Sequence, residues 1–214
     1  MTGPHILVVH SPGPPPGAEE EKESTRALVD YANDPGAPLV SDEVYEHFIY
    51  DTRHWSAGLF GEDVITVNAT SKTFAMTGWR LGYMAGPKEY VEQSLKVHQY
   101  CQACASSVSQ YAALAGYTGP QDCVREMRDE YRARRDYLYG RMRELGFDFP
   151  VPEGAFYLFV PMKRSMIEQI IKSGVIVVPG EAFGVNAPDY ARMCYAASMD
   201  DLERAVERIS AVVG

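Results

Sequence analysis

Short apolar runs alternate with polar, helix-length stretches in the first hundred residues. The runs rich in apolar and β-branched residues predict strands at 6–9, 37–42, 63–67 and 81–85. Residues 18–33 predict a helix, because acidic residues occupy its first turn and Ala27, Leu28 and Tyr31 could form a buried side. This order of strands and helices predicts an α/β unit with a mostly parallel sheet of about four strands, one edge of which is open.

The pattern changes after residue 87. Two long helices are predicted over residues 88–117 and 121–145. Short strands are then expected at 155–160, 175–178 and 192–196, with helices over 165–172 and 201–213. This second half reads as an α+β module. We therefore expect two domains, residues 1–100 and residues 101–214.

Composition and charge narrow the classes of function. The chain has 214 residues, of which 46% are hydrophobic and 23% charged, as in ordinary globular proteins. Its formal net charge of −9 argues against general nucleic-acid binding, and no apolar run is long enough to cross a membrane. Four cysteines are too few for a disulfide scaffold, and the N-terminus has no basic region typical of a signal peptide, so we expect a cytoplasmic protein. Cys101 and Cys104 lack a second cysteine pair, and no metal site is predicted.

Candidate chemistry lies where two predicted strands end. Asp42 closes the strand at 37–42, and Ser71 and Lys72 follow the strand at 63–67. In parallel sheets, active sites collect just beyond the carboxyl ends of strands. Lys72 has small and apolar neighbours, and such surroundings lower the pKa of an amine and make it nucleophilic. Arg80 stands between two glycines, which suits a guanidinium that binds phosphate.

These residues belong to a longer set of ordered motifs. The stretch Ser71-Lys-Thr-Phe-Ala-Met-Thr-Gly-Trp-Arg-Leu-Gly82 resembles the lysine signature of class I/II aminotransferases, which are fold-type-I enzymes dependent on pyridoxal 5'-phosphate. Further resemblances, in family order, are Asp42-x-x-Tyr45 and the segments 154–159, 178–184 and 190–195. The resemblance implies part of a fold-type-I large domain, with an α/β/α sheet, followed by a C-terminal small domain.

The resemblance also implies how the cofactor is held. Lys72 would form the Schiff base with the cofactor aldehyde and then shuttle the substrate proton. Asp42 would keep the pyridine nitrogen protonated, and Tyr45 would hydrogen-bond the phenolic oxygen. Arg80 would bind the phosphate. Ser71 could donate to the phosphate or could equally be a turn or cap residue.

The reaction implied is transfer of an amino group between an amino acid and a 2-oxo acid. Arg192 would clamp the substrate α-carboxylate with two hydrogen bonds, although a salt-bridged surface arginine is the ordinary alternative. Family active sites form at a subunit interface, so a homodimer is also implied by the resemblance.

Two features depart from the family pattern. Pro14 occupies the position where the family has an asparagine that contacts the cofactor, and proline cannot donate that bond. Family members are also nearly twice as long, and their additional N-terminal half completes the sheet and the cofactor site. An inactive fragment or pseudoenzyme that needs this half, or a related lyase that uses the same cofactor, therefore stays open as an alternative.

Overall fold

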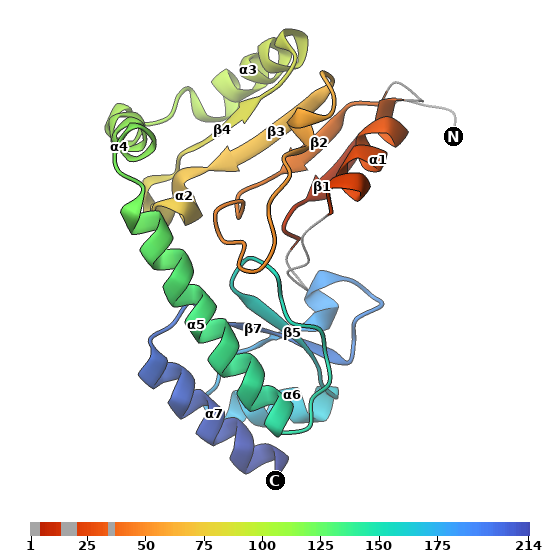
Figure 1. Cartoon of the computed structure of the whole chain (residues 1–214), viewed down its shortest axis with the longest axis vertical. Helices are drawn as coiled ribbons and strands as arrows, with labels where there is room; N and C mark the ends of the chain where they lie inside the picture. Colours follow the sequence, from red (N-terminus) through yellow and green to blue (C-terminus); the bar gives the residue numbers. More distant parts are fainter. Residues whose placement is uncertain (1–4, 14–20, 34–36) are drawn as a thin grey trace. The chain divides into compact units, whose positions relative to one another are not determined.

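The computed structural model describes residues 5–13, 21–33 and 37–214 (Figure 1). They divide into two compact units. The first holds the described residues up to Pro12 and those from Glu21 to Glu126, and the second holds Gly13 and Met127–Gly214. The division falls within helix α5 (Asp122–Glu144), not near residue 100 as the sequence suggests. Residues just beyond 100 belong with the first unit, because Ser109 Oγ donates to the carbonyl of Trp79 at 2.8 Å.

A four-stranded sheet forms the centre of the first unit, in the order β1-β2-β3-β4. Its strands are β1 (Leu7–His10), β2 (Leu39–Asp42), β3 (Val64–Ala69) and β4 (Gly82–Ala85). The first three are parallel, as predicted, and β4 runs antiparallel to β3. Only the short helix α2 (Thr70–Thr73) and the 3₁₀ turn η2 (Thr77–Trp79) join β3 to β4. A parallel strand would need a crossover that returns along the sheet.

Helix α1 (Lys22–Asn33) packs against this sheet (Figure 1). The predicted buried side of α1 is wrong: Tyr31 is 63% exposed, while Thr25, Val29 and Ala32 are buried. These three follow the i, i+4, i+7 spacing of a single helical face. Val29 and Ala32 form one core cluster with Leu39, Ala57 and Val64. The expected first turn, residues 18–20, lies outside the described residues.

The single helix predicted over residues 88–117 is two helices, α3 (Lys88–Gln102) and α4 (Ser107–Thr118). Ala103 ends α3, because its φ of 59° lies in the left-handed region. Helix α4 packs against the rest of the first unit through Tyr117, whose ring meets that of Phe74 edge-to-face at 5.0 Å between centroids. In the described parts of the chain, no helix is long and apolar enough to cross a membrane.

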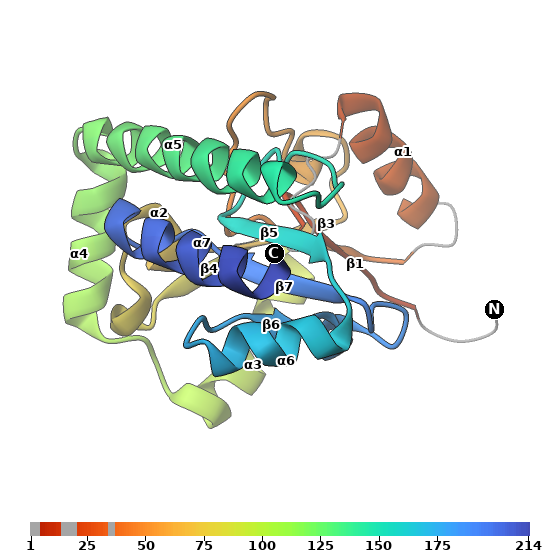
Figure 2. The ribbon, with the colours of Figure 1, turned by 90° about the horizontal axis from the view of Figure 1, so that it is seen from below.

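The second unit is the α+β module that the sequence predicts. Its antiparallel sheet, in the order β5-β7-β6, comprises β5 (Tyr157–Pro161), β6 (Val178–Pro179) and β7 (Tyr190–Cys194). The C-terminal part of α5, α6 (Arg164–Lys172) and α7 (Met199–Val213) lie over one face of this sheet (Figure 2). The strands alternate accordingly, with Leu158 and Met193 buried while Tyr157 and Arg192 are half-buried. An α/β sheet followed by an α+β module confirms the predicted architecture.

Candidate active site

The predicted site residues of the first unit collect at one edge of its sheet. Asp42 is the last residue of β2 and pairs in register with Val67 of β3. Tyr45 lies in the turn that follows β2, and Lys72 lies on α2, directly after β3. Because β2 and β3 are parallel, their carboxyl ends reach the same edge. The fold therefore places an amine, a carboxylate and a phenol at the end of two neighbouring strands.

Lys72 lies beside the ring of Tyr45. Its Nζ is 5.7 Å from the centroid of that ring, and the lysine side chain is half-buried while Tyr45 is buried. This distance is within the range of a cation–π contact. Ser71, on the same helix, is also half-buried. The contact places the amine of Lys72 over the Tyr45 ring, next to the strand end that carries Asp42.

Both carboxylate oxygens of Asp42 have a nitrogen nearby. Oδ1 accepts a hydrogen bond from the backbone N–H of Val44 at 3.2 Å, and Oδ2 lies 3.2 Å from Nδ1 of His10. His10 is the register partner of Asp42 on β1. The Asp42 side chain remains 32% exposed, so its oxygens are oriented by neighbours without being sealed off. This arrangement suits a carboxylate that receives a further donor from a ligand.

Arg80 is held in an unusual backbone conformation. Its φ of 53° and ψ of 50° are left-handed, and Ala75 also has a positive φ of 52°. Such conformations are costly for residues other than glycine and cluster at functional sites. The guanidinium is exposed, and its Nη1 donates to the carbonyl of Thr77 at 2.9 Å. A Cβ added to Gly78 would meet no atom within 4 Å, so the space on that side of the loop is open.

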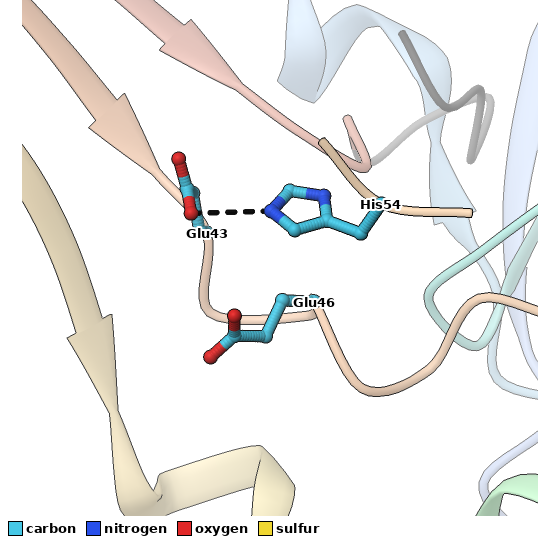
Figure 3. Close-up of side chains that lie close together, drawn as sticks. All are labelled: Glu43, Glu46 and His54. Atoms are coloured by element: carbon cyan, nitrogen blue, oxygen red, sulfur yellow. Dashed lines mark hydrogen bonds and ion pairs between the residues drawn. The ribbon is translucent and has the colours of Figure 1, made fainter. Parts of the chain in front are cut away.

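A buried glutamate that the sequence pattern does not predict lies in the middle of this site. Glu43, between Asp42 and Tyr45, is 1% exposed and accepts from Ser41 Oγ at 2.8 Å and from the N–H of Ala57 at 3.1 Å. Its Oε2 lies 3.1 Å from Nε2 of His54 (Figure 3). Ser56 Oγ also donates to Glu43, at 3.1 Å. One carboxylate thus ties the segment 54–57 to the strand end that carries Asp42.

The pKa of Glu43 follows from this balance. Burial by itself raises the pKa of a carboxyl group. Here the hydrogen bonds from His54, Ser41 and Ser56, together with the charge of His54, outweigh burial and hold the pKa of Glu43 below its ordinary value. Glu43 is therefore an ionised, structural anchor. The sequence did offer a signal for Glu43. Side chains alternate between the two faces of a strand, so of the neighbours Asp42 and Glu43 one is expected to point inward.

A ligand atom from each of Glu43, Glu46 and His54 lies within 4.8 Å of the others (Figure 3). This distance would permit a metal ion, but hydrogen bonds from protein donors already occupy both carboxylates. The Oε1 atom of Glu46 accepts from Asn68 Nδ2 at 2.5 Å, and Glu43 faces His54 as a hydrogen-bonded pair. The cluster is accordingly explained as a hydrogen-bond network that stabilises the turn after β2.

Arg192 belongs to the second unit, in the middle of β7. Its guanidinium carbon lies 4.4 Å from the ring centroid of Tyr157 and 4.5 Å from that of Phe183. It is half-buried on the face of the sheet opposite the buried residues Ala191 and Met193. Pro14, where the sequence departs from the asparagine of the family, lies outside the described residues.

Comparison with known proteins supports the resemblance seen in the motifs. Residues 2–209 match the family described as Aminotransferase class I and II. The chain is 38% identical over 212 residues to a probable aspartate aminotransferase of Methanocaldococcus jannaschii, covering 94% of this chain and 56% of that protein. It is also 38% identical to aromatic-amino-acid aminotransferase 2 of Thermococcus litoralis, covering 97% of this chain and 57% of the relative.

Solved structures agree with these similarities. The aromatic aminotransferase from Pyrococcus horikoshii OT3 superposes with a TM-score of 0.92 at 39% identity, over 97% of this chain and 59% of that one. Aspartate aminotransferase from Thermus thermophilus with maleate gives a TM-score of 0.89 at 37% identity, over 97% and 56%. The chain thus spans little more than half the length of the relatives that it matches.

Proposed function

Because the chain belongs to the class I and II aminotransferase family, we propose that it serves in transfer of an amino group between an amino acid and a 2-oxo acid, with pyridoxal 5'-phosphate as cofactor. The observation that carries the proposal is that Lys72, a half-buried residue, places its amine beside the ring of Tyr45, at the sheet edge where Asp42 ends β2. An amine, a phenol and an anion at one sheet edge are the groups that this chemistry requires.

The donor set fits the cofactor. Asp42, whose oxygens are oriented by Val44 and His10, would hold the pyridine nitrogen. Tyr45 would donate to the phenolic oxygen. Arg80, with open space beside Gly78, would bind the phosphate together with the Ser71 hydroxyl. When bound, the cofactor supplies an electron-withdrawing ring that stabilises negative charge developing at the substrate Cα.

Each of three side chains would have a separate role in the reaction. After the substrate amino group has displaced Lys72 from the cofactor, the Lys72 amine would take the proton from the substrate Cα as a base and return a proton as an acid. The Asp42 carboxylate keeps a proton on the ring nitrogen, and so maintains the positive charge of the ring. The guanidinium of Arg192 binds the substrate α-carboxylate through two parallel N–H donors, a geometry that lysine cannot offer.

A homodimer is part of the proposal, as the family resemblance implies. Exposed apolar side chains on two helices of the first unit support its association with a second copy of the chain. They are Leu95, Val97 and Tyr100 on α3 and Tyr111 and Leu114 on α4.

The cytoplasm is the compartment that we propose. The four cysteines of the chain are free and exposed, which fits the reducing conditions there.

The test is residue-specific labelling with the cofactor. The chain is mixed with pyridoxal 5'-phosphate, reduced with borohydride and digested, and the modified lysine is located by mass spectrometry. We expect modification at Lys72, together with a visible absorption band that Lys72→Ala removes. Lys88→Ala, at a lysine whose side chain is 88% exposed, should retain the band. Label spread over surface lysines, with an unchanged band in Lys72→Ala, would refute cofactor binding at this site.

A second assay separates transfer from lyase chemistry. Aspartate and phenylalanine are suitable first substrates, since the relatives are named for aspartate and aromatic amino acids. Amino-group transfer requires a 2-oxo acid as acceptor, for which 2-oxoglutarate serves as the first probe, whereas a lyase forms its product from the amino acid alone. Product formation without the acceptor would favour the lyase. Cofactor bound at Lys72 with no product in either assay would favour the inactive-fragment alternative.

A further inference from the structure

The exposed face of the sheet in the second unit carries a group of aromatic rings around one arginine. Strand alternation places Tyr157 and Phe159 of β5 and Tyr190 and Arg192 of β7 on this face. Phe159 and Arg192 are direct register partners. Phe183 joins them from the 3₁₀ turn η3 (Gly180–Phe183). Four rings and one guanidinium therefore share the face opposite the helices. In antiparallel sheets with one face on the core, the other face usually carries polar residues.

Two of the rings contact the guanidinium and the other two support them. Tyr157 and Phe183 have their centroids 4.4 and 4.5 Å from the guanidinium carbon of Arg192. Phe159 meets Phe183 edge-to-face at 6.2 Å and stacks on Tyr190 at 4.8 Å, with an angle of 9° between the planes. These separations are within the range of favourable aromatic pairs. These contacts join the four rings and the guanidinium into one connected layer.

The layer leaves the hydrogen-bond donors of Arg192 available. An aromatic ring attracts a guanidinium through its face, whereas the five N–H donors point outward in the guanidinium plane. Within the part of the chain that the structure describes, no carboxylate forms an ion pair with Arg192. Arg164 of the same unit is different, since it pairs with Glu168 and Glu181. Arg192 is therefore restrained without being neutralised.

We propose that Tyr157 and Phe183 are positioning residues that hold the Arg192 guanidinium ready for a planar carboxylate. This inference rests on the proposed function, in which Arg192 binds the α-carboxylate of the substrate. Orientation in advance lowers the conformational entropy lost when the ligand binds. The two rings act through Arg192 and need no contact with the carboxylate.

The first experiment needs no ligand. Relaxation of the Arg192 Nε–Hε group in the ¹⁵N-labelled chain of 214 residues reports how strongly the guanidinium is restrained on the picosecond-to-nanosecond timescale. Removal of either ring, in Tyr157→Leu or Phe183→Leu, is expected to lower the order parameter of this group. Tyr157→Phe keeps the ring and is expected to match the unmodified chain. Tyr139→Leu is the matched control, because it removes a ring of the same unit that pairs with Phe149 and is not one of the four rings around Arg192.

The second experiment titrates the same samples with maleate, the ligand named in the solved Thermus thermophilus structure. A saturable shift of the Arg192 Nε–Hε signal is expected, with affinity weakened about twofold to fivefold when one ring is removed. Phe183 is 39% exposed, so its replacement by leucine should disturb folding little. Phe183→Leu can therefore be tested even if Tyr157→Leu does not fold.

The outcomes separate the two claims. If maleate shifts the signal but both leucine variants bind it as tightly as the unmodified chain and keep a rigid guanidinium, the positioning role is overturned while the carboxylate role of Arg192 stands. If maleate produces no shift in the unmodified chain, or if calorimetry finds the same maleate affinity in Arg192→Lys as in the unmodified chain, the carboxylate role fails and the positioning proposal fails with it.

Discussion

The imidazole Nδ1 of His10 lies 3.2 Å from Oδ2 of Asp42, across the register that joins β1 to β2. The two residues are 32 positions apart in sequence, by subtraction of their numbers, and each closes its strand. Their side chains are 56% and 32% exposed, so solvent weakens the interaction between them. The contact nevertheless restrains the carboxylate that we propose for the pyridine nitrogen.

Removing this contact should weaken cofactor binding modestly. His10→Phe keeps a ring but has no nitrogen to face Asp42, and an exposed pair of this kind is worth about twofold to fivefold in affinity. Titration with pyridoxal 5'-phosphate, followed by visible absorption, measures the change. His47→Asn serves as control, because His47 lies near Glu46 instead. Equal affinity in His10→Phe and the unmodified chain would show that Asp42 is oriented without His10.

Glu43 should make the stability of the first unit sensitive to acid. Its pKa is lower in the folded chain than its ordinary value of 4.5, so its contribution to stability is complete above pH 4.5. That contribution is lost as the pH falls through the lowered folded pKa. Glu43→Gln should cost about 3 kcal/mol near neutral pH, because it leaves His54 and two hydroxyl donors without their carboxylate.

Urea unfolding at several pH values tests this expectation. Glu43→Gln should also flatten the loss of stability below pH 4.5, since the titrating group is gone. Glu62→Gln, at an exposed position, should behave as the unmodified chain does at every pH. If the free energy of unfolding falls equally steeply below pH 4.5 in Glu43→Gln and in the unmodified chain, another carboxylate causes the acid sensitivity.

The left-handed backbone at Ala75 should be relieved by glycine. Ala75 has a φ of 52°, where a side chain costs about 1 kcal/mol that glycine avoids. Ala75→Gly should therefore raise stability by a similar amount in chemical unfolding. Ala115→Gly, at an exposed position inside α4, should instead lower stability by about 1 kcal/mol. Destabilisation by both substitutions would mean that Ala75 is not strained in solution.

Arg80 should discriminate between cofactor forms with and without phosphate. Its guanidinium offers paired donors that an ammonium lacks, so Arg80→Lys should weaken pyridoxal 5'-phosphate binding about tenfold. Binding of pyridoxal, which has no phosphate, should not change. Competition with inorganic phosphate gives an independent measurement. An equal loss of affinity for pyridoxal would indicate that the substitution disturbs the loop rather than a phosphate contact.

The local pattern of the sequence was enough to predict most elements and the strand ends that carry the candidate site. Apolar runs located the four strands of the first unit, and the order of strands and helices predicted parallel neighbours. Asp42 and Lys72 were then expected at one edge, because parallel strands carry their carboxyl ends to the same side. These conclusions depend only on spacing, propensity and the direction of the chain.

Tertiary structure decided the remainder. The pairing of Glu43 with His54 depends on how the turn after β2 folds back, and the break at Ala103 depends on a single backbone angle. Likewise, Phe183 reaches Arg192 only because η3 brings it to the exposed face of β7. A local pattern states which residues prefer to be buried or paired. Which partner each one meets is decided by packing between distant segments, whose free energy no short stretch of sequence contains.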